Sequence, residues 1–532
     1  MIKTLSKISR YFKVALDLRD YLKEIYTPQQ CRETIRKRIA ERERNFLNMV
    51  ETGIFKNRES PYLKLLMLAG CEFGDIQSSV SQHGIEETLR KLHASEVYLT
   101  YDEFKGRKEV IRGGKSFRFQ PGDFNNPSLY HHLSVQTGGT TGDGVRVLQS
   151  FEYYAQLAAH RALLFEVHGL WEIPHGIWYP ILPGIIGVYT LLQSIKVGKV
   201  PEKWFSPVAK EYIKNTFMRR FRTNWLIHAG RLWGTRLPKP EFVDLDNAAK
   251  IAKWVAEMIR DYSGCCVAAH PSSAVRICHA AKEKGLDIKG TKFLMGGEPI
   301  TVAKLNEIET AGARAIPIYA FAEGGTVGYG CANPVHSDEI HFQRDSLAVI
   351  QYKKKLPESG QTVDAFLFSS LLPTAPKILL NVDIGDYGVV ESRQCGCEYE
   401  EIGFDDHIHS IRSYAKLNSE GLTVPTRMLT RLIEEVLPSK YGGNSTDYQI
   451  VEEEDGKGLT RLNILVSPRV GEISEEEILN TVYGEFKREK RETIKSDIFS
   501  QAGTFRVKRL NPISTEMGKI LPLHMGKRKM NF

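Results

Sequence analysis

A run of glycines and threonines at residues 134–144, Ser-Val-Gln-Thr-Gly-Gly-Thr-Thr-Gly-Asp-Gly, has the composition of a phosphate-binding loop. Glycine lets backbone N–H groups approach phosphate oxygens closely, and threonine hydroxyls add further donors. A nucleotide loop of the Walker type would end in Gly-Lys-Ser or Gly-Lys-Thr, whereas here Val145 and Arg146 follow Gly144. Taken alone, the run is equally consistent with a flexible turn.

Further polar motifs follow this run along the chain. They are Gly296-Gly297-Glu298-Pro299, Tyr319-Ala320-Phe321-Ala322-Glu323, Asp383-Ile384-Gly385-Asp386, Arg412 and Ser514-Thr515-Glu516-Met517-Gly518-Lys519. Each has a simple structural explanation by itself, because an aspartate after glycine usually belongs to a turn and a lysine near a terminus is usually solvated. The order in which the motifs occur is therefore more informative than any one of them.

In order and spacing, these motifs are similar to those of the adenylate-forming superfamily, which includes acyl-CoA synthetases, peptide-synthetase adenylation domains and luciferases. Within it, the chain most resembles phenylacetate–CoA ligase and its relatives, over residues of about 134–525. The resemblance implies that the protein converts a carboxylic acid and ATP into an acyl-adenylate and pyrophosphate. The acyl group would then pass to a thiol, and we expect that thiol to be coenzyme A.

The resemblance assigns a role to each motif, and the chemistry of the residues suits these roles. The loop would hold the triphosphate, Glu323 would bind Mg²⁺, and Asp386 would accept hydrogen bonds from both ribose hydroxyls. Arg412 would donate to the ribose or a phosphate, and Lys519 would place its ammonium between the carboxylate and the α-phosphate. The residues expected to bind the nucleotide are Thr137, Gly138, Gly139, Thr140, Thr141, Gly142, Gly297, Glu298, Pro299, Tyr319, Ala320, Asp386 and Arg412, with Gly297, Glu298 and Pro299 beside the adenine.

Some positions depart from the family pattern. Ala322 stands where a threonine or serine normally precedes the glutamate, and Ser413 follows Arg412 where an aspartate or lysine is expected at the interdomain hinge. Because the second half-reaction requires rotation about that hinge, the acceptor could instead be an amine or the phosphopantetheine of a carrier protein. A further alternative is a zinc-containing relative that no longer catalyses a reaction.

A second group of residues could hold a metal ion. Cys395-Gly396-Cys397 supplies two thiolates, and Cys331, His336 and His341 supply further ligand types from a distant segment. Some phenylacetate–CoA ligase relatives carry a structural zinc ion in these two places. The resemblance favours His341 over His336, although reduced structural cysteines remain the alternative.

The surrounding sequence predicts the elements that must position these residues. Residues 1–126 read mostly as helices, for example at 31–50 and 85–92. Between residues 127 and 412, strands at 291–295, 315–319 and 347–352 alternate with helices at 246–261 and 302–311. Residues 413–532 read as a small α+β module, with a hairpin at 448–466, a helix at 474–490 and a strand at 504–510. We therefore predict an α/β protein in which a helical N-terminal extension precedes a large ATP- and carboxylate-binding domain of sheets flanked by helices and a small, mobile C-terminal lid domain.

Composition limits the class of protein. The chain has 532 residues, of which 42% are hydrophobic and 26% charged, and its net charge is +8, as in an ordinary soluble globular protein. Pro180, Pro183 and Gly184 interrupt the most apolar stretch, and residues 1–26 lack the apolar run and cleavage site of a secretory signal, so we do not expect this segment to be one. With only eight cysteines in so long a chain, we expect a cytoplasmic protein whose partners are a small carboxylic acid and a thiol or amine acceptor, with neither nucleic acid nor membrane among them.

Overall fold

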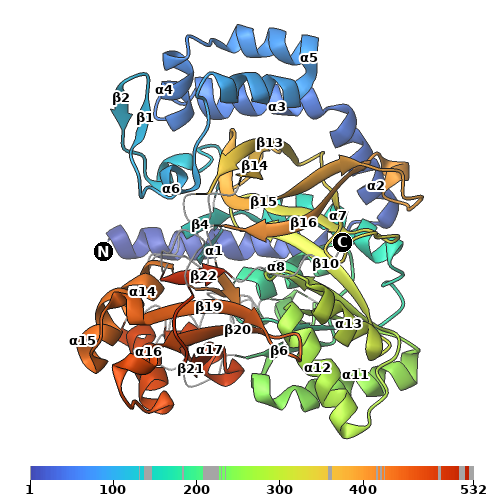
Figure 1. The fold of residues 1–532 in the computed structure, drawn as a ribbon. Helices are drawn as coiled ribbons and strands as arrows, with labels where there is room; N and C mark the ends of the chain where they lie inside the picture. The colour runs from blue at the N-terminus through green and yellow to red at the C-terminus, as the bar shows by residue number, and fades with distance from the viewer. Residues whose placement is uncertain are drawn as a thin grey trace.

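The computed structural model of the chain combines one large mixed sheet, helices on both of its faces and a small C-terminal domain (Figure 1). It describes residues 2–130, 132–136, 146–181, 185–207, 227–228, 230–233, 235–356, 362–414, 417–419, 422–424, 426–488, 493–513 and 522–525. The predicted α/β class is confirmed. Among the described helices, none combines the length and apolar character that a membrane span requires.

The large sheet has a parallel half and an antiparallel half that meet at β10 (Arg314–Phe321). The parallel half runs β7 (Pro240–Phe242), β6 (Lys203–Ser206), β5 (His175–Trp178), β8 (Cys265–Ala269), β9 (Thr291–Gly296) and β10. The antiparallel half continues with β11 (Gly325–Gly330), β12 (Ile340–Phe342), β16 (Asp406–Ser413), β15 (Val382–Ser392), β14 (Thr362–Ser370) and β13 (Leu347–Lys355). In open parallel sheets, ligands bind beyond the carboxyl ends of the strands, which places the end of β10 at the expected position of a site.

Strand β8 shows how the sequence specifies the parallel half. All five of its residues, Cys-Cys-Val-Ala-Ala, are buried, as expected of a strand covered on both faces. Cys266 and Ala268 pack toward a core shared with α7 (Phe151–Val167) and α8 (Ile185–Lys196). Cys265, Val267 and Ala269 face the opposite core, beneath α11 (Ala248–Tyr262) and α12 (Pro271–Lys284).

The N-terminal region is joined to the large domain through a common core. Its helices are α1 (Ile2–Lys23), α2 (Pro28–Ala40), α3 (Arg42–Val50), α4 (Pro61–Leu68), α5 (Phe73–Ala94) and α6 (Tyr101–Phe104), followed by the hairpin β1 (Val110–Arg112) and β2 (Lys115–Phe117). Figure 1 shows α3, α4 and α5 beside β13 and β14. One buried cluster combines side chains of α3–α6 with those of β13–β16, and Asn381 Nδ2 donates to the carbonyls of Leu89 and Val97 at 2.8 and 3.2 Å. The region is therefore an integral part of the large domain's packing.

The C-terminal domain has a core of its own. Its four-stranded sheet has the order β21 (Phe505–Lys508), β20 (Thr460–Val466), β19 (Tyr448–Glu454) and β22 (Leu523–Met525). Helices α14 (Thr426–Arg431), α15 (Leu437–Tyr441), α16 (Glu475–Arg488) and α17 (Thr493–Ala502) accompany this sheet, and most of them supply side chains to a separate hydrophobic cluster. The predicted hairpin, helix and strand of this module are confirmed to within a few residues.

Two further short hairpins lie outside the two larger sheets. Strands β17 (Leu417–Ser419) and β18 (Leu422–Val424) pair near the start of the C-terminal part. Strands β3 (Leu133–Gln136) and β4 (Arg146–Gln149) pair with Gln136 opposite Arg146. The glycine-rich run that links β3 to β4, including Thr137, Gly138, Gly139, Thr140, Thr141 and Gly142, lies outside the described residues, as does Lys519.

Candidate functional site

The end of β10 and the middle of β15 meet at the centre of the candidate site. Tyr319 donates a hydrogen bond from its hydroxyl to Asp386 Oδ2 at 3.0 Å, although four steps of the sheet order separate the two strands. Burial and the neighbouring Asp386 raise the pKa of Tyr319 well above its ordinary value, so the phenol remains a donor. The pairing of β10 with β11 shifts register between Tyr319 and Ala320, a local irregularity of the kind that re-aims side chains beside functional sites.

Asp386 and Asp383, on the same strand, have different surroundings. Asp383 is fully buried, accepts from Tyr352 Oη at 2.8 Å and Lys354 Nζ at 2.6 Å, and also contacts the Tyr414 hydroxyl. Asp386 is 8% exposed and accepts from the Tyr319 hydroxyl. The enclosed Asp383 therefore serves the fold, whereas Asp386 is the carboxylate of this pair that reaches the surface of the site.

Glu323, just beyond β10, is paired with a lysine from the N-terminal region. Its side chain is 6% exposed and contacts the ammonium of Lys105, which is 11% exposed. A second lysine, Lys377, is fully buried nearby and donates to Asn125 Oδ1 at 2.8 Å. Burial lowers the pKa of Lys377 to about 8, and the negative charge of Glu323 opposes that shift. One ammonium group therefore contacts the Glu323 carboxylate and a second lies near enough to sense its charge, so positive charge gathers beside Glu323, which favours anionic ligands there.

Glu298, which is expected beside the adenine, has a buried side chain that forms an ion pair within the fold. Its carboxylate is fully buried and pairs with Lys304 Nζ at 3.1 Å, while Ser272 Oγ donates to the same oxygen at 2.5 Å. Lys304 comes from α13 (Val302–Thr310) and also donates to Thr460 Oγ1 of the C-terminal domain at 3.3 Å. The side chain of Glu298 thus ties α12, α13 and the C-terminal domain together.

This buried pair predicts both a stability loss and a pH dependence. Burial alone would raise the pKa of Glu298, but Lys304, His270 and Ser272 hold it below its ordinary value. Its contribution is then fully present above the unfolded pKa of about 4.3 and is lost as the pH falls through the lower folded pKa. We expect Lys304→Met to lower the free energy of unfolding by about 3 kcal/mol at pH 7, because it leaves a buried charge without its partner. Denaturant unfolding between pH 3.5 and 7 would measure this, and the Lys304→Met/Glu298→Gln double variant should recover more than half of the loss.

Arg412 is held by an acidic residue of the loop between β11 and β12. Its guanidinium donates to Asp338 Oδ2 at 3.0 Å, and the same carboxylate accepts from the backbone N–H groups of Ser410 and Ile411 at 2.8 and 2.9 Å. Ser410 has φ 53°, a left-handed conformation that side chains other than glycine seldom adopt. Asp338 therefore fixes both the irregular backbone before Arg412 and the arginine itself.

Beyond Arg412, the chain is anchored by Tyr414. Its hydroxyl contacts Asp383 and accepts from Lys354 Nζ at 2.8 Å. Burial and Asp383 raise the pKa of Tyr414. The predicted hinge position, where Ser413 replaces the usual aspartate or lysine, is thus followed by a tyrosine that is held to β15 and β13.

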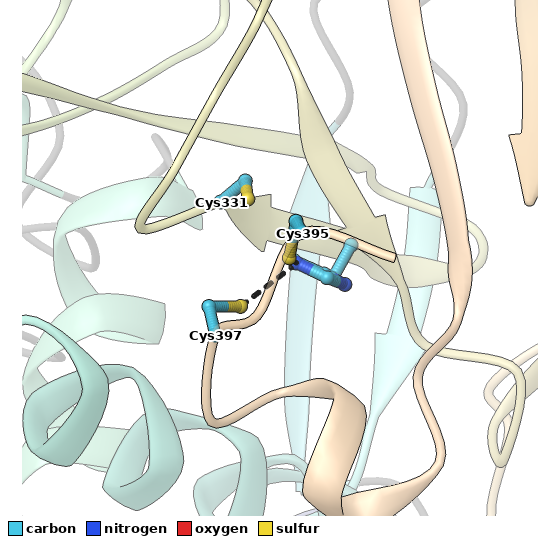
Figure 2. Close-up of side chains that lie close together, drawn as sticks. Cys331, Cys395 and Cys397 are labelled. Atoms are coloured by element: carbon cyan, nitrogen blue, oxygen red, sulfur yellow. Dashed lines mark hydrogen bonds between the residues drawn. The ribbon is translucent and has the colours of Figure 1, made fainter. Parts of the chain in front are cut away.

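Four of the five predicted metal ligands lie together, as Figure 2 shows for the three cysteines. The ligand atoms of Cys331, His341, Cys395 and Cys397 all lie within 4.8 Å of one another. His341 Nε2 is 3.4 Å from Cys395 Sγ and 3.1 Å from Cys397 Sγ. His341 Nδ1 lies 2.7 Å from the Phe404 carbonyl, which selects the tautomer that turns the Nε2 lone pair toward the sulfurs. His336 lies elsewhere, with its ring stacked on that of His409 at 3.8 Å.

The thiols of this group are electrostatically linked. A hydrogen bond from Cys331, together with His341 and Cys395, lowers the pKa of Cys397 to about 3, against the effect of burial. The pKa of Cys331 is raised, first by the thiolate of Cys397 and then by burial. A thiolate beside an imidazole lone pair and two further sulfurs is the donor set of a tetrahedral zinc site.

Sequence reasoning missed Lys105, Lys377, Asp338 and Tyr414. Lys105 lies 218 residues from Glu323, and no local pattern marks it as a partner of that residue. Of these four residues, Tyr414 was the easiest to suspect from the sequence, because it lies in the hinge segment where the residues depart from the family pattern.

Comparison with known proteins identifies the fold. No protein-family model matches the sequence, and no curated protein matches it. Among solved structures, 2-hydroxyisobutyryl-CoA ligase with 2-HIB-AMP and CoA, in the thioesterification state, matches with a TM-score of 0.56 and 13% identity over 91% of this chain and 90% of that chain. The same ligase in the postadenylation state has a TM-score of 0.46 at 13% identity, over 92% and 90% of the two chains. An amide bond synthetase from Marinactinospora thermotolerans has a TM-score of 0.42 at 12% identity, over 86% and 91%. On the match with a TM-score of 0.56, the chain has the fold of that 2-hydroxyisobutyryl-CoA ligase.

Proposed function

We propose that this chain is an AMP-forming carboxylate ligase. In the first step, a carboxylate oxygen attacks the α-phosphorus of ATP and the bond to the β-phosphate breaks, giving an acyl-adenylate and pyrophosphate. In the second step, a thiol attacks the acyl carbon, AMP leaves, and the thiol proton is released. The acceptor we propose is coenzyme A.

The observation that carries this proposal is the contact of Asp386 with Tyr319, on the strand β10 that leads directly to Glu323. The contact between Tyr319 and Asp386 brings together two motifs that lie 67 residues apart. Glu323 lies at the adjoining turn, where its carboxylate contacts Lys105 and its charge acts on the buried Lys377. A carboxylate that can accept hydrogen bonds from ribose hydroxyls, close to a region suited to phosphates, is the arrangement that a nucleotide requires.

Each residue has a defined part in the proposed reaction. Asp386 would accept hydrogen bonds from the ribose hydroxyls, with Tyr319 holding its second oxygen in place. Arg412 would donate near the ribose or a phosphate, and Lys519 would stabilise the charge that develops between the carboxylate and the α-phosphate. Glu323 would hold Mg²⁺, which when bound offsets the negative charge of the phosphates. The glycine-rich residues 137–142 would hold the triphosphate.

The acceptor separates this proposal from its alternatives. The matched ligase with a TM-score of 0.56 is described in complex with both its adenylate and CoA, which supports a thiol acceptor on this fold. An amine or a carrier-protein phosphopantetheine would use the same first step. A zinc-containing relative without activity would carry out neither step.

The first experiment is ATP–pyrophosphate exchange with Mg²⁺ and a panel of aryl, fatty and amino acids. We expect exchange with one acid class, which would show adenylate formation and name the substrate type. Coenzyme A, an amine and a loaded carrier protein would then be added separately to identify the acceptor. No exchange across the panel, from folded protein that binds ATP, would favour the non-catalytic alternative.

We further propose that Cys331, His341, Cys395 and Cys397 hold a structural zinc ion. The ion would join the segment after β11 to the loop between β15 and β16, and it would take no part in the chemistry. We expect purified protein to contain one zinc per chain at this group, and Cys397→Ala to lose it and to unfold at a lower temperature. Cys71→Ala serves as the matched control, since Cys71 is a partly exposed free cysteine outside the group. Equal zinc content in the two variants would contradict this site.

The pairing of Glu323 with Lys105 leads to a prediction about Mg²⁺. We expect Lys105→Met to lower the free energy of unfolding by about 3 kcal/mol without ligand, because a buried carboxylate loses a counter-charge. MgATP should reverse part of this loss, since Mg²⁺ supplies positive charge at the same carboxylate. Thermal unfolding with and without MgATP measures both quantities, and exposed Lys108→Met is the control. A loss of equal size in the two conditions would argue against Glu323 as a ligand of Mg²⁺.

A further inference from the structure

A second group of metal-ligating side chains lies apart from the cysteine group. It consists of His336, on the loop between β11 and β12, Glu391 on β15 and His409 on β16. One ligand atom from each of the three lies within 4.8 Å of those from the other two. Because Glu391 pairs directly with His407 on the neighbouring strand, Glu391 and His409 are diagonal neighbours on one face of the sheet.

The orientation of His409 leaves a ligand atom available. Its Nδ1 lies 3.0 Å from Ser410 Oγ, so the hydroxyl can accept the ring proton at that nitrogen. Its Nε2 is buried and makes no hydrogen bond within the described chain, and it lies 3.5 Å from Glu391 Oε1. A buried nitrogen without a hydrogen bond is costly, and a nearby carboxylate is a natural co-ligand for a cation.

His336 adds the third ligand. Its ring is stacked on that of His409 with centroids 3.8 Å apart and planes inclined by 10°. The His336 side chain is exposed, so it can adjust by rotation without disturbing a core. In a tetrahedral site with bonds of about 2.1 Å, ligand atoms lie about 3.4 Å apart. The exposed His336 ring would therefore turn out of its stack on His409, so that the lone pairs of both rings meet at one ion.

We propose that His336, Glu391 and His409 form a second metal site, for a divalent transition-metal ion of the zinc class. Two imidazoles and one carboxylate suit Zn²⁺, Co²⁺ or Ni²⁺ better than the hard ions Mg²⁺ and Ca²⁺. Water would complete the coordination, because His336 is exposed and the side chain of Glu391 is 41% exposed.

The ion would fasten the loop that carries Asp338. Asp338 follows His336 by two residues and holds Ser410, Ile411 and Arg412. A metal that joins His336 to His409 would therefore hold the same loop to β16 at a second point. The site is distinct from the cysteine group, since none of its three ligands belongs to that group.

The test is a Co²⁺ titration of the full chain with its cysteine group already loaded with zinc. We expect one further equivalent of Co²⁺ to bind without the thiolate-to-cobalt absorption of a sulfur site, and the unfolding temperature to rise. His336→Gln and Glu391→Gln should each weaken this binding at least tenfold. His83→Gln, which removes an exposed histidine from α5, should bind as the unmodified chain does.

Two outcomes would overturn the site: binding that persists unchanged in His336→Gln and Glu391→Gln, or binding that His83→Gln weakens equally. The first outcome would mean that the ion binds at other residues. The second would mean that Co²⁺ binds non-specifically to surface histidines. The titration contains neither ATP nor a carboxylic acid, so its result is independent of the proposed ligase activity.

Discussion

Replacing Asp386 with alanine is expected to lower kcat/KM for ATP by about 100- to 10,000-fold. Each hydrogen bond from a ribose hydroxyl to a carboxylate contributes about 1.5–3 kcal/mol, and the variant loses two of them. The ribose is equally bound before and during the transfer at phosphorus, so the effect should fall mainly on KM. ATP–pyrophosphate exchange at varied ATP concentration separates KM from kcat.

Two companion variants make this test specific. Tyr319→Phe keeps the ring but removes the hydroxyl that orients Asp386, and we expect it to weaken ATP binding by about tenfold. Asp364→Ala removes a partly exposed aspartate of β14 that pairs with Lys353, and it should leave exchange unchanged. If the Asp386→Ala enzyme kept an ordinary KM for ATP, Asp386 would not be a residue that binds the nucleotide.

Lys519→Ala should lower kcat, whereas Asp386→Ala should mainly raise the KM for ATP. If its ammonium meets the charge that develops between the carboxylate and the α-phosphate, its removal lowers kcat by about 100- to 1000-fold with little effect on the KM for ATP. Single-turnover formation of the acyl-adenylate measures this step directly. Lys457→Ala, in the exposed turn between β19 and β20, is the control from the same domain. Exchange at an undiminished rate would show that another group performs the task.

The sequence predicted the elements well where hydrophobic periodicity and capping agree. Strand β9 was expected at 291–295 and spans Thr291–Gly296, and helix α13 was expected at 302–311 and spans Val302–Thr310 behind its Thr301 cap. The helix expected at 31–50 is divided at Glu41 into α2 and α3. Apolar spacing continues across that break, so periodicity alone could not reveal it.

The candidate site was predictable in part. The order of the motifs led to Tyr319, Asp386 and Glu323, and the structure brings the first two into contact. It could not reveal that Glu298 is enclosed by Lys304, because that depends on how α13 packs against α12 and the C-terminal domain. Of the two histidine candidates, the resemblance favoured His341, and the structure places that residue on the buried strand β12 beside the cysteines, whereas His336 lies in the exposed loop before it.

The core shared by the N-terminal helices and β13–β16 has a consequence for synthesis of the chain. The backbone of Leu99 bonds to that of Asn381, about 280 residues later. At about 5–20 residues per second, the ribosome needs about 15 to 60 s to synthesise the chain from Leu99 to Asn381, beside which the strands of this core lie. During that interval the apolar sides of α3–α5 have no strands to cover them. We therefore expect the nascent chain to engage chaperones early and to become resistant to protease only after β15 has emerged.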